Sequence, residues 1–371
     1  MLSSRDTSDD RLELVGWEPM KDTAFRVGIV GCGYGAQVLT PAFRSDPRVR
    51  VVAISAQSQA KAQESAQALA VPEAFGDWRD MLDPDRTDAV AIATPPNAQL
   101  EIALVALGRG LAVFAEKPLA LSVDAGQVLV HAAEASGRAN MIDFNFREIA
   151  AFRAAYDQLR SGALGTIHHV AVTWHVESYA NRARLQSWKT NVDSGGGALS
   201  NCVSHSLDYL EWMLGPIASL GASLAGMPGD VRQNDTSVGL IMRFKGGAAG
   251  GLMMSAAAYR GSGHRIEIYG EKGSLILENP GPDYMRGFRF LFARRPDALA
   301  PVEVPKSEDA WRDGRVLPAA RLAKRFTDWA LGGAPCEPSF AAGLRVQTLL
   351  EAARKSSKTG TWIDTPANEL G

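Results

Sequence analysis

Cysteine, excess charge and long hydrophobic runs are all scarce in this sequence, and each scarcity excludes a class of protein. The three cysteines, Cys32, Cys202 and Cys336, form no CxxC pair, which excludes a disulfide framework and a thiolate zinc site. Lysine and arginine number 39 against 41 aspartate and glutamate residues, a formal net charge of −2. This balance argues against nucleic acid or an anionic membrane as the main partner.

No uncharged apolar run approaches the roughly 18–20 residues that a bilayer-spanning helix needs, so no membrane segment is expected. Residues 1–24 form a charged N-terminal extension without the apolar core of a secretory signal. We therefore expect a cytoplasmic protein. What the sequence does contain is apolar material, 46% of 371 residues, and at ~100–200 residues per domain the chain is long enough for two domains.

The first domain is expected over residues 25–146, where short apolar runs alternate with amphipathic stretches of helical period. This alternation predicts βαβ units and a parallel sheet. The expected strands are 26–30, 49–54, 88–93 and 111–115. The expected helices begin near Ala36 and then cover 61–69, 99–107 and the stretch from the Ser122 cap to Gly137.

The second domain, residues 147–371, is expected to be α+β with a large open-faced, mainly antiparallel sheet. A helix to Gly162 and a strand over 168–177 precede a basic, glycine-rich loop at 179–197 and a helix over 198–214. Further strands are expected at 237–244, 249–257, 265–269 and 274–278, and residues 280–318 are expected to be irregular surface. The whole chain is thus an α/β protein with two unlike domains.

A glycine motif follows the first expected strand. Gly31, Gly33 and Ala36 form G-x-G-x-x-A at the start of a helix, the context that a Rossmann dinucleotide site requires. Gly31 permits a tight turn, Gly33 lets the backbone approach a pyrophosphate, and the helix N-terminus attracts its charge. The expected contacts in this loop are Gly31, Cys32, Gly33, Tyr34, Gly35 and Ala36.

The end of the second strand bears on the choice of cofactor. A carboxylate there accepts hydrogen bonds from the ribose 2′-hydroxyl of NAD and repels the 2′-phosphate of NADP. This chain instead has Ser55, Gln57 and Ser58, followed by Lys61, and all of these side chains can donate to a phosphate. The loop favours NADP(H), with NAD(H) as the alternative.

Candidate catalytic residues come from two segments. Lys117 follows the strand 111–115, at the edge of a parallel sheet where ligands bind. Asn201, His205 and Asp208 are spaced to share one face of the helix 198–214, and a histidine flanked by an amide and a carboxylate is an acid/base candidate. The sheet edge supplies further expected cofactor contacts: Thr94, Pro95, Asn97, Gln99, Glu116 and Lys117.

Three motifs together resemble the oxidoreductase family named for glucose-fructose oxidoreductase, inositol dehydrogenase and the rhizopine catabolism protein (Gfo/Idh/MocA). They are the glycine motif, Glu116-Lys117-Pro118 and the run from Gly195 to Asp208. The resemblance implies a Rossmann domain and a second domain that binds substrate and forms a homodimer or homotetramer. It also implies that Lys117 is the active-site lysine and His205 the acid/base histidine, acting on a sugar, a cyclitol or a nucleotide-linked sugar.

Two residues depart from the pattern that the resemblance implies. The family commonly has aspartate where this chain has Asn201, and histidine where it has Gln99. An asparagine side chain cannot exchange a proton. Proton transfer would therefore fall to His205 or Lys117, with Asn201 holding the substrate oxygen or the lysine.

The basic loop bears on the substrate. Guanidinium groups bind phosphates and carboxylates, and aromatic rings stack on sugars or bases. The loop is thus either a solvated basic surface or part of a site for an anionic sugar. The expected substrate contacts are Arg147, Tyr179, Arg182, Trp188, Lys189, Asn201 and His205. His169 and His175 share a strand face without a third ligand at suitable spacing, so no metal site is expected.

The sequence predicts an NAD(P)-dependent oxidoreductase that transfers a hydride between nicotinamide and a ring carbon bearing a hydroxyl or keto oxygen. Two alternatives remain: an NAD-assisted glycoside hydrolase on the same scaffold, and a cofactor-sensing regulatory protein without activity.

Overall fold

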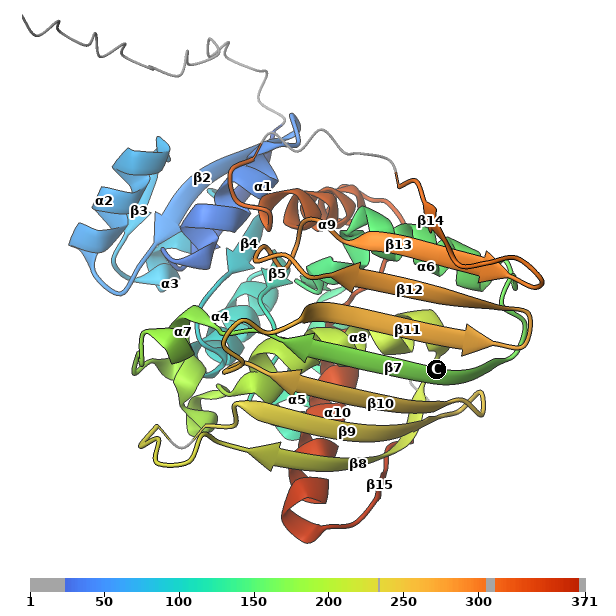
Figure 1. The fold of residues 1–371 in the computed structure, drawn as a ribbon. Coiled ribbons are helices and arrows are strands. Elements are labelled where there is room, and N and C mark those ends of the chain that lie inside the picture. The colour runs from blue at the N-terminus through green and yellow to red at the C-terminus, as the bar shows by residue number, and fades with distance from the viewer. Residues whose placement is uncertain (1–23, 233, 305–310, 367–371) are drawn as a thin grey trace, which may run out of the picture.

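The computed structural model describes residues 24–232, 234–304 and 311–366, and it contains two sheets (Figure 1). The expected extension 1–24 therefore lies almost wholly outside the described residues. The first sheet has six strands in the order β3-β2-β1-β4-β5-β6, and every neighbouring pair is parallel. This strand order is that of a Rossmann domain.

The elements of the first sheet follow the predicted βαβ alternation. The strands are β1 (Phe25–Val30), β2 (Val49–Ser55), β3 (Glu73–Phe75), β4 (Ala89–Ile92), β5 (Ala112–Ala115) and β6 (Asn140–Ile142). The connecting helices are η1 (Gly35–Leu39), α1 (Thr40–Arg44), α2 (Gln59–Leu69), α3 (Trp78–Met81), α4 (Pro96–Gly108) and α5 (Val123–Ser136). All residues of β4 and β5 are buried, as expected for strands covered by helices on both faces.

The second sheet has nine strands in the order β14-β13-β12-β11-β7-β10-β9-β8-β15. Its strands are β7 (Ile167–His175), β8 (Ile217–Ala225), β9 (Ser237–Phe244), β10 (Ala249–Ser255), β11 (Gly263–Gly270), β12 (Gly273–Asn279), β13 (Arg289–Arg294), β14 (Ala300–Val302) and β15 (Ile363–Asp364). All neighbouring pairs are antiparallel except β7 and β10, which are parallel.

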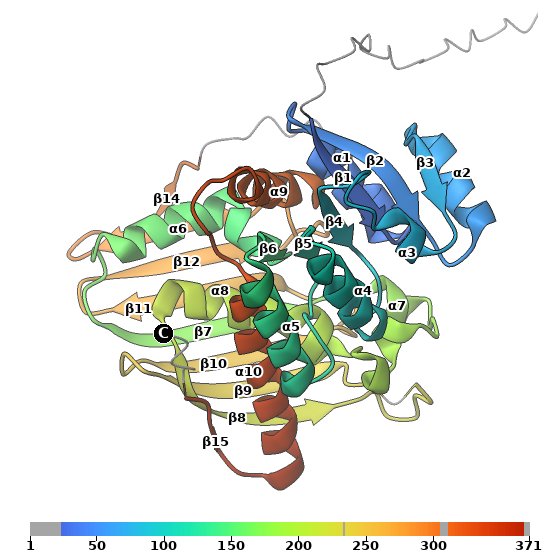
Figure 2. The ribbon, with the colours of Figure 1, turned by 180° about the vertical axis from the view of Figure 1, so that it is seen from behind.

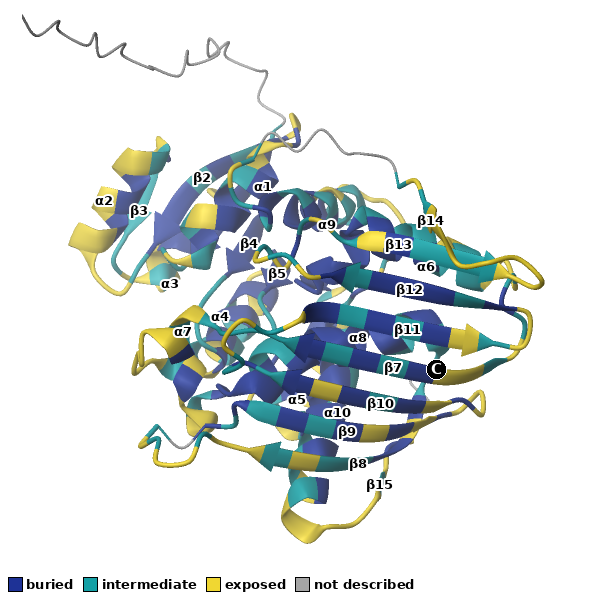
Figure 3. Ribbon diagram, in the orientation of Figure 1, coloured by how far each residue is buried: buried dark blue, intermediate teal, exposed yellow. Residues whose placement is uncertain are grey.

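Helices cover one face of this second sheet (Figure 2). Of the helices that follow β6, α6 (Ala150–Arg160), η5 (Leu199–Val203), α8 (Ser204–Leu214) and α10 (Phe340–Thr359) lie on this face. The others are η2 (Asn145–Glu148), α7 (Tyr179–Arg182), η3 (Trp188–Thr190), η4 (Val192–Ser194) and α9 (Val316–Ala330). The other face is open, and residues along it are exposed or half-buried (Figure 3). Ile241 and Met253 on this face are 61% and 57% exposed.

The C-terminal helices pack on the Rossmann domain. Helix α9 contacts η1 and α1, and α10 contacts both α5 and β8. Phe326 of α9 is fully buried against Phe43 and Phe114 of the first sheet's layer, with ring centroids 6.1 and 5.7 Å away. The C-terminal helices therefore pack against the first domain as well as the second, and this ties the two domains together.

Six strands were not expected from the sequence: β3, β6, β8, β13, β14 and β15. Residues 280–318 contain β13 and β14, so the expectation of irregular surface is wrong for that part. Strand β8 was not identified. Its segment IASLGASLA carries small residues in place of the large β-branched and aromatic side chains that indicate a strand.

The expected substrate contact Arg147 is instead part of a buried ion pair. Its Nε donates to Asp208 Oδ2 at 2.9 Å, and its Nη2 donates to Asp208 Oδ1 at 2.5 Å. The side chains are 9% and 1% exposed. Arg147 therefore ties η2 to α8, and Asp208 is engaged by this arginine rather than by His205. Helical spacing placed Asp208 near His205 but could not reveal a partner 61 residues away.

Among the described residues, no helix is long and apolar enough to cross a membrane.

Candidate active site

The glycine loop has the geometry of a dinucleotide site. Gly31 has φ +109°, and a Cβ there would lie 2.4 Å from the Ala93 carbonyl oxygen, so only glycine fits. A Cβ at Gly33 would meet no atom within 4 Å, which leaves the backbone open to a bound group. The helix that follows begins with a π-helical turn, η1, a form often found at functional sites.

Neighbouring groups at the sheet edge also fit a nicotinamide dinucleotide. The Thr94 hydroxyl is buried without a hydrogen-bond partner, and such a group is normally satisfied. Asn97, in the first turn of α4, is exposed. A cofactor with hydroxyl and amide groups would supply the missing partners here, because Thr94 follows closely after β4, the strand next to β1.

The loop after β2 is less free than the sequence suggested. Ser55 is 1% exposed, and its carbonyl accepts from Gly31 N at 2.9 Å. The hydroxyl of Ser58 caps α2 by accepting from Lys61 N at 3.3 Å, and Lys61 Nζ lies 2.8 Å from Glu64 Oε2. Only Gln57 is both exposed and without such a contact in the described chain. The pair of Lys61 and Glu64 is itself exposed, so it holds Lys61 weakly.

Gln99, an expected cofactor contact, is buried and its amide nitrogen binds the loop that carries Lys117. Its side chain is 1% exposed, and Nε2 donates to the carbonyl oxygens of Glu116, Pro118 and Leu119 at 2.7, 3.1 and 3.0 Å. These three carbonyls belong to the loop that carries Lys117. Gln99, a residue of α4, therefore holds the lysine loop in place.

Lys117 bridges the two domains. Its Nζ donates to the backbone carbonyl oxygen of Asn201 at 2.8 Å, so the lysine binds the main chain of η5 rather than the Asn201 amide. The Asn201 side chain is used elsewhere, since Nδ2 donates to the Lys189 carbonyl at 2.9 Å. Asn201 thus positions Lys117 through its backbone carbonyl, and it positions the loop that contains Lys189 through its side chain.

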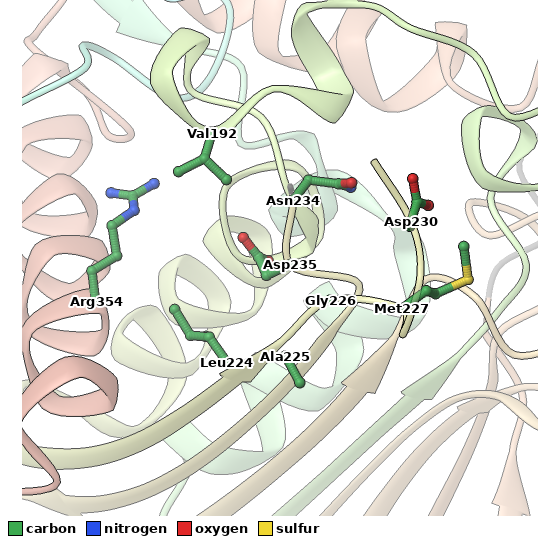
Figure 4. Close-up of a pocket in the computed structure, with 9 residues that line it drawn as sticks. All are labelled: Val192, Leu224, Ala225, Gly226, Met227, Asp230, Asn234, Asp235 and Arg354. Carbon is green, nitrogen blue, oxygen red and sulfur yellow. The ribbon is translucent and has the colours of Figure 1, made fainter. Parts of the chain in front are cut away.

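The π-helical segment η5 is held from behind by Asp235 and Arg354. Asp235 Oδ2 accepts from Leu199 N at 2.6 Å, and Arg354 Nη2 donates to Ser200 Oγ at 2.6 Å. Figure 4 shows these two side chains at a pocket between α10 and the loop that joins β8 to β9. The pocket is lined by Val192, Leu224, Ala225, Gly226, Met227, Asp230, Asn234, Asp235 and Arg354. None of these is an expected site residue. Two of them, Asp235 and Arg354, connect the pocket to η5 through their hydrogen bonds.

His205 lies among aromatic rings, 7% exposed. Its ring centroid is 4.7 Å from that of Phe146 and 6.1 Å from that of Phe144, and its Nδ1 is buried without a partner. Burial, reinforced by the charges of Lys117 and His264, lowers the pKa of His205 well below its ordinary value. The imidazole is therefore neutral near neutral pH, able to share hydrogen bonds but weakly basic.

The basic loop divides into two parts. Lys189 is exposed as a whole residue. Its ammonium group is nevertheless partly desolvated, and this desolvation, followed by the charge of Lys117, lowers the pKa of Lys189. Trp188 lies beside it, 5.7 Å from Nζ to the ring centroid. Tyr179 is 66% exposed, with Arg182 5.9 Å from its ring centroid. Within the described chain no contact joins Tyr179 or Arg182 to Lys117 or His205.

Sequence analysis missed one acidic residue of the site. Asp143, directly after β6, is 1% exposed and accepts from Tyr34 Oη at 2.8 Å. It also lies close enough to Glu116 for the two carboxyl groups to interact. No strand was expected over residues 140–142, so no sequence pattern placed Asp143 at the sheet edge where ligands bind.

The histidines, cysteines and acidic residues of the described ranges form no group of three or more that could hold a metal ion.

Comparison with known proteins agrees with this geometry. Residues 25–144 match the model "Oxidoreductase family, NAD-binding Rossmann fold", and residues 157–365 match "Oxidoreductase family, C-terminal alpha/beta domain". An uncharacterized oxidoreductase of Synechocystis sp. is 30% identical over 362 residues, covering 93% of this chain and 97% of that protein. Levoglucosan dehydrogenase of Pseudarthrobacter phenanthrenivorans is 25% identical over 386 residues, covering 92% of this chain and 98% of that protein.

Solved structures share the fold. Levoglucosan dehydrogenase in complex with NADH and levoglucosan superposes with a TM-score of 0.83 at 23% identity, covering 93% of this chain and 100% of that one. The WlbA dehydrogenase of Bordetella pertussis, in complex with NADH and UDP-GlcNAcA, has a TM-score of 0.78 at 23% identity, covering 94% and 99%. With both halves of the chain matched, this protein belongs to the Gfo/Idh/MocA family of oxidoreductases.

Proposed function

We propose that the protein is an NAD(P)-dependent dehydrogenase or ketoreductase that transfers a hydride to or from a ring carbon of a sugar, a cyclitol or a nucleotide-linked sugar. The observation that carries the proposal is the bond between Lys117 Nζ and the Asn201 carbonyl. It places a proton-exchanging amine where the dinucleotide domain meets the second domain, beside His205. The relatives that act on levoglucosan and bind UDP-GlcNAcA support a sugar-like substrate.

The nicotinamide ring, when bound by the glycine loop and the Thr94 edge, supplies the hydride acceptor or donor. The residues of this chain handle the proton. In oxidation a neutral Lys117 removes the hydroxyl proton as the hydride leaves the same carbon, and in reduction the ammonium returns a proton to the forming alkoxide. Neutral His205 orients the substrate oxygen, and Asn201 keeps Lys117 in place through its backbone carbonyl.

The substrate is proposed to carry a negative charge. The charges of Lys117 and Arg315 both act on Lys189, so three cations lie near one another. Lys189 Nζ has no hydrogen-bond acceptor in the described part of the chain, and a carboxylate or phosphate would satisfy it. Arg147 cannot contribute, because Asp208 already occupies its guanidinium.

Replacing Lys117 by methionine should abolish turnover while leaving cofactor binding intact. The change removes the proton-exchanging amine but no group of the glycine loop, so kcat should fall about 10²-fold or more. Steady-state kinetics and a fluorescence titration of the reduced cofactor measure the two effects separately. Lys61→Met is the matched control and should keep its kcat. Near-normal turnover by Lys117→Met would exclude the catalytic role.

Replacing His205 by glutamine should lower kcat/KM without removing an ionisation from the pH profile. The pKa of His205 is already far below its ordinary value, so the wild-type ring stays neutral from about pH 6 to 8. The loss, about tenfold or more, comes from poorer orientation of the substrate oxygen. A wild-type ionisation near pH 6.5 that disappears in His205→Gln would show instead that the histidine is the base.

NADP(H) should bind more tightly than NAD(H), because no carboxylate ends β2. Introducing one by Ala56→Asp should reverse the preference, since it repels the 2′-phosphate and accepts from the 2′-hydroxyl. Glu64→Gln should tighten NADP(H) alone, because it frees Lys61. Fluorescence titrations of both cofactors test this, and equal affinity or tighter NAD(H) binding by the wild type would contradict it.

A second copy of the chain is proposed to cover the open face of the nine-stranded sheet. Exposed Ile241, Met253 and Tyr269 lie on the strands of that sheet, and such a surface suits a partner. A homodimer, or a homotetramer built from two of them, should be seen by native mass spectrometry. Ile241→Lys together with Met253→Lys should shift the assembly toward smaller species, and a wild-type monomer would contradict the proposal.

A further inference from the structure

Two buried carboxyl groups meet beside Lys117. Glu116 follows β5 and Asp143 follows β6, neighbouring strands whose carboxyl ends lie at the same sheet edge. The two carboxyl groups lie close enough to hydrogen-bond when one of them carries a proton. One oxygen of each, Glu116 Oε1 and Asp143 Oδ1, is buried and accepts from no other group in the described chain.

Tyr34 and Asn145 fix one side of this pair. Tyr34 Oη donates to Asp143 Oδ2 at 2.8 Å, and it accepts from Asn145 Nδ2 at 3.1 Å. Tyr34 stands just before η1 in the glycine loop, and the strand order places β4 and β5 between β1 and β6. The tyrosine therefore reaches across the edge of the sheet where a nicotinamide ring is expected.

The chemistry of the pair requires a proton between the two carboxyl groups. An ionised carboxylate only accepts hydrogen bonds, so two carboxyls in contact bond to one another when one of them carries a proton. Two ionised carboxylates in a buried site would repel each other strongly. Burial raises the pKa of Glu116 well above its ordinary value, Asp143 raises it further, and burial also raises the pKa of Asp143.

The surrounding charges favour keeping one negative charge rather than none. Lys117 and Lys189 act on Glu116, and Lys117 and Arg315 act on Asp143. Burial raises the pKa of Tyr34 well above its ordinary value, and it raises the pKa of its neighbour Tyr284 to about 12. Both tyrosines are therefore neutral, and the site holds cations opposite a single shared negative charge.

We propose that Glu116 and Asp143 share one proton and together act as a positioning group, whose single negative charge holds Lys117 in place and balances its charge next to the nicotinamide position. The pair takes on a role that the amide of Asn201 cannot fill, because it has no charge. The shared proton stays on the pair during turnover, and the substrate proton goes to Lys117. This role rests on the proposed function, whereas the sharing of the proton does not.

Infrared spectroscopy of the whole protein tests the shared proton directly, without substrate. Near neutral pH the wild type should show a carboxylic-acid C=O band that shifts in heavy water. Glu116→Gln and Asp143→Asn should each lose it, because the remaining carboxyl is then ionised and accepts from the new amide. Asp46→Asn is the control: Asp46 is buried in the same domain but paired with Arg48, so this change should remove only carboxylate bands.

The pH profile of kcat/KM then tests the role. Each single amide variant keeps one negative charge, so the low-pH limb should stay within a few tenths of a unit of the wild type, whatever the rate. The double variant has no negative charge at positions 116 and 143. The low-pH limb of its kcat/KM profile should move by about one unit or more toward lower pH, because Lys117 then loses its proton more readily.

Each result decides on either the shared proton or the positioning role. Absence of the acid band from the wild type, or its persistence in both single variants, would overturn the shared proton. A limb that shifts in each single variant would mean that both carboxyls are ionised, and an unshifted limb in the double variant would overturn the positioning role. If no substrate supports turnover, the infrared result still decides on the shared proton, so the failure of the proposed function is recognised separately.

Discussion

The site depends on one hydrogen bond between domains, from Lys117 Nζ to the Asn201 carbonyl at 2.8 Å. A flexible lysine directs its ammonium to a fixed point only if both ends of the contact are held. Gln99 fixes the lysine loop through three backbone carbonyls. On the opposite side, Asp235 and Arg354 fix η5 through Leu199 and Ser200. Both ends of the contact, the lysine loop and η5, are thus held by hydrogen bonds to their backbones or side chains.

This arrangement also explains how an asparagine serves at position 201. The contact to Lys117 is made by the main chain, so it survives any side chain that leaves η5 intact. The amide is free to bind the Lys189 carbonyl and to hold the preceding loop. Negative charge near Lys117 comes instead from Glu116 and Asp143, which belong to the Rossmann domain. The Rossmann domain thus supplies the negative charge near Lys117, and the second domain supplies the carbonyl that positions its ammonium group.

The sequence predicted what local pattern determines and failed where distant residues decide. The glycine loop, the Ser122 cap and the helix end at Gly137 all depend on near neighbours and were found at their expected places. Arg147 and Gln99 were assigned to binding because exposure cannot be deduced from composition, and their partners lie 17 to 61 residues away. Asp143 was missed because its meeting with Glu116 requires the order of the strands.

The most direct test of the account is the transfer of label from cofactor to product. The protein is incubated with NADPH or NADH carrying deuterium at the transferable position of carbon 4, together with a pool of neutral and acidic keto sugars, and the products are analysed by mass spectrometry. The account predicts one deuterium on a carbon that bears a new hydroxyl group, formed by wild type and not by Lys117→Met. Cofactor binding without labelled product, or cleavage of glycosidic bonds with no net label transfer, would contradict it.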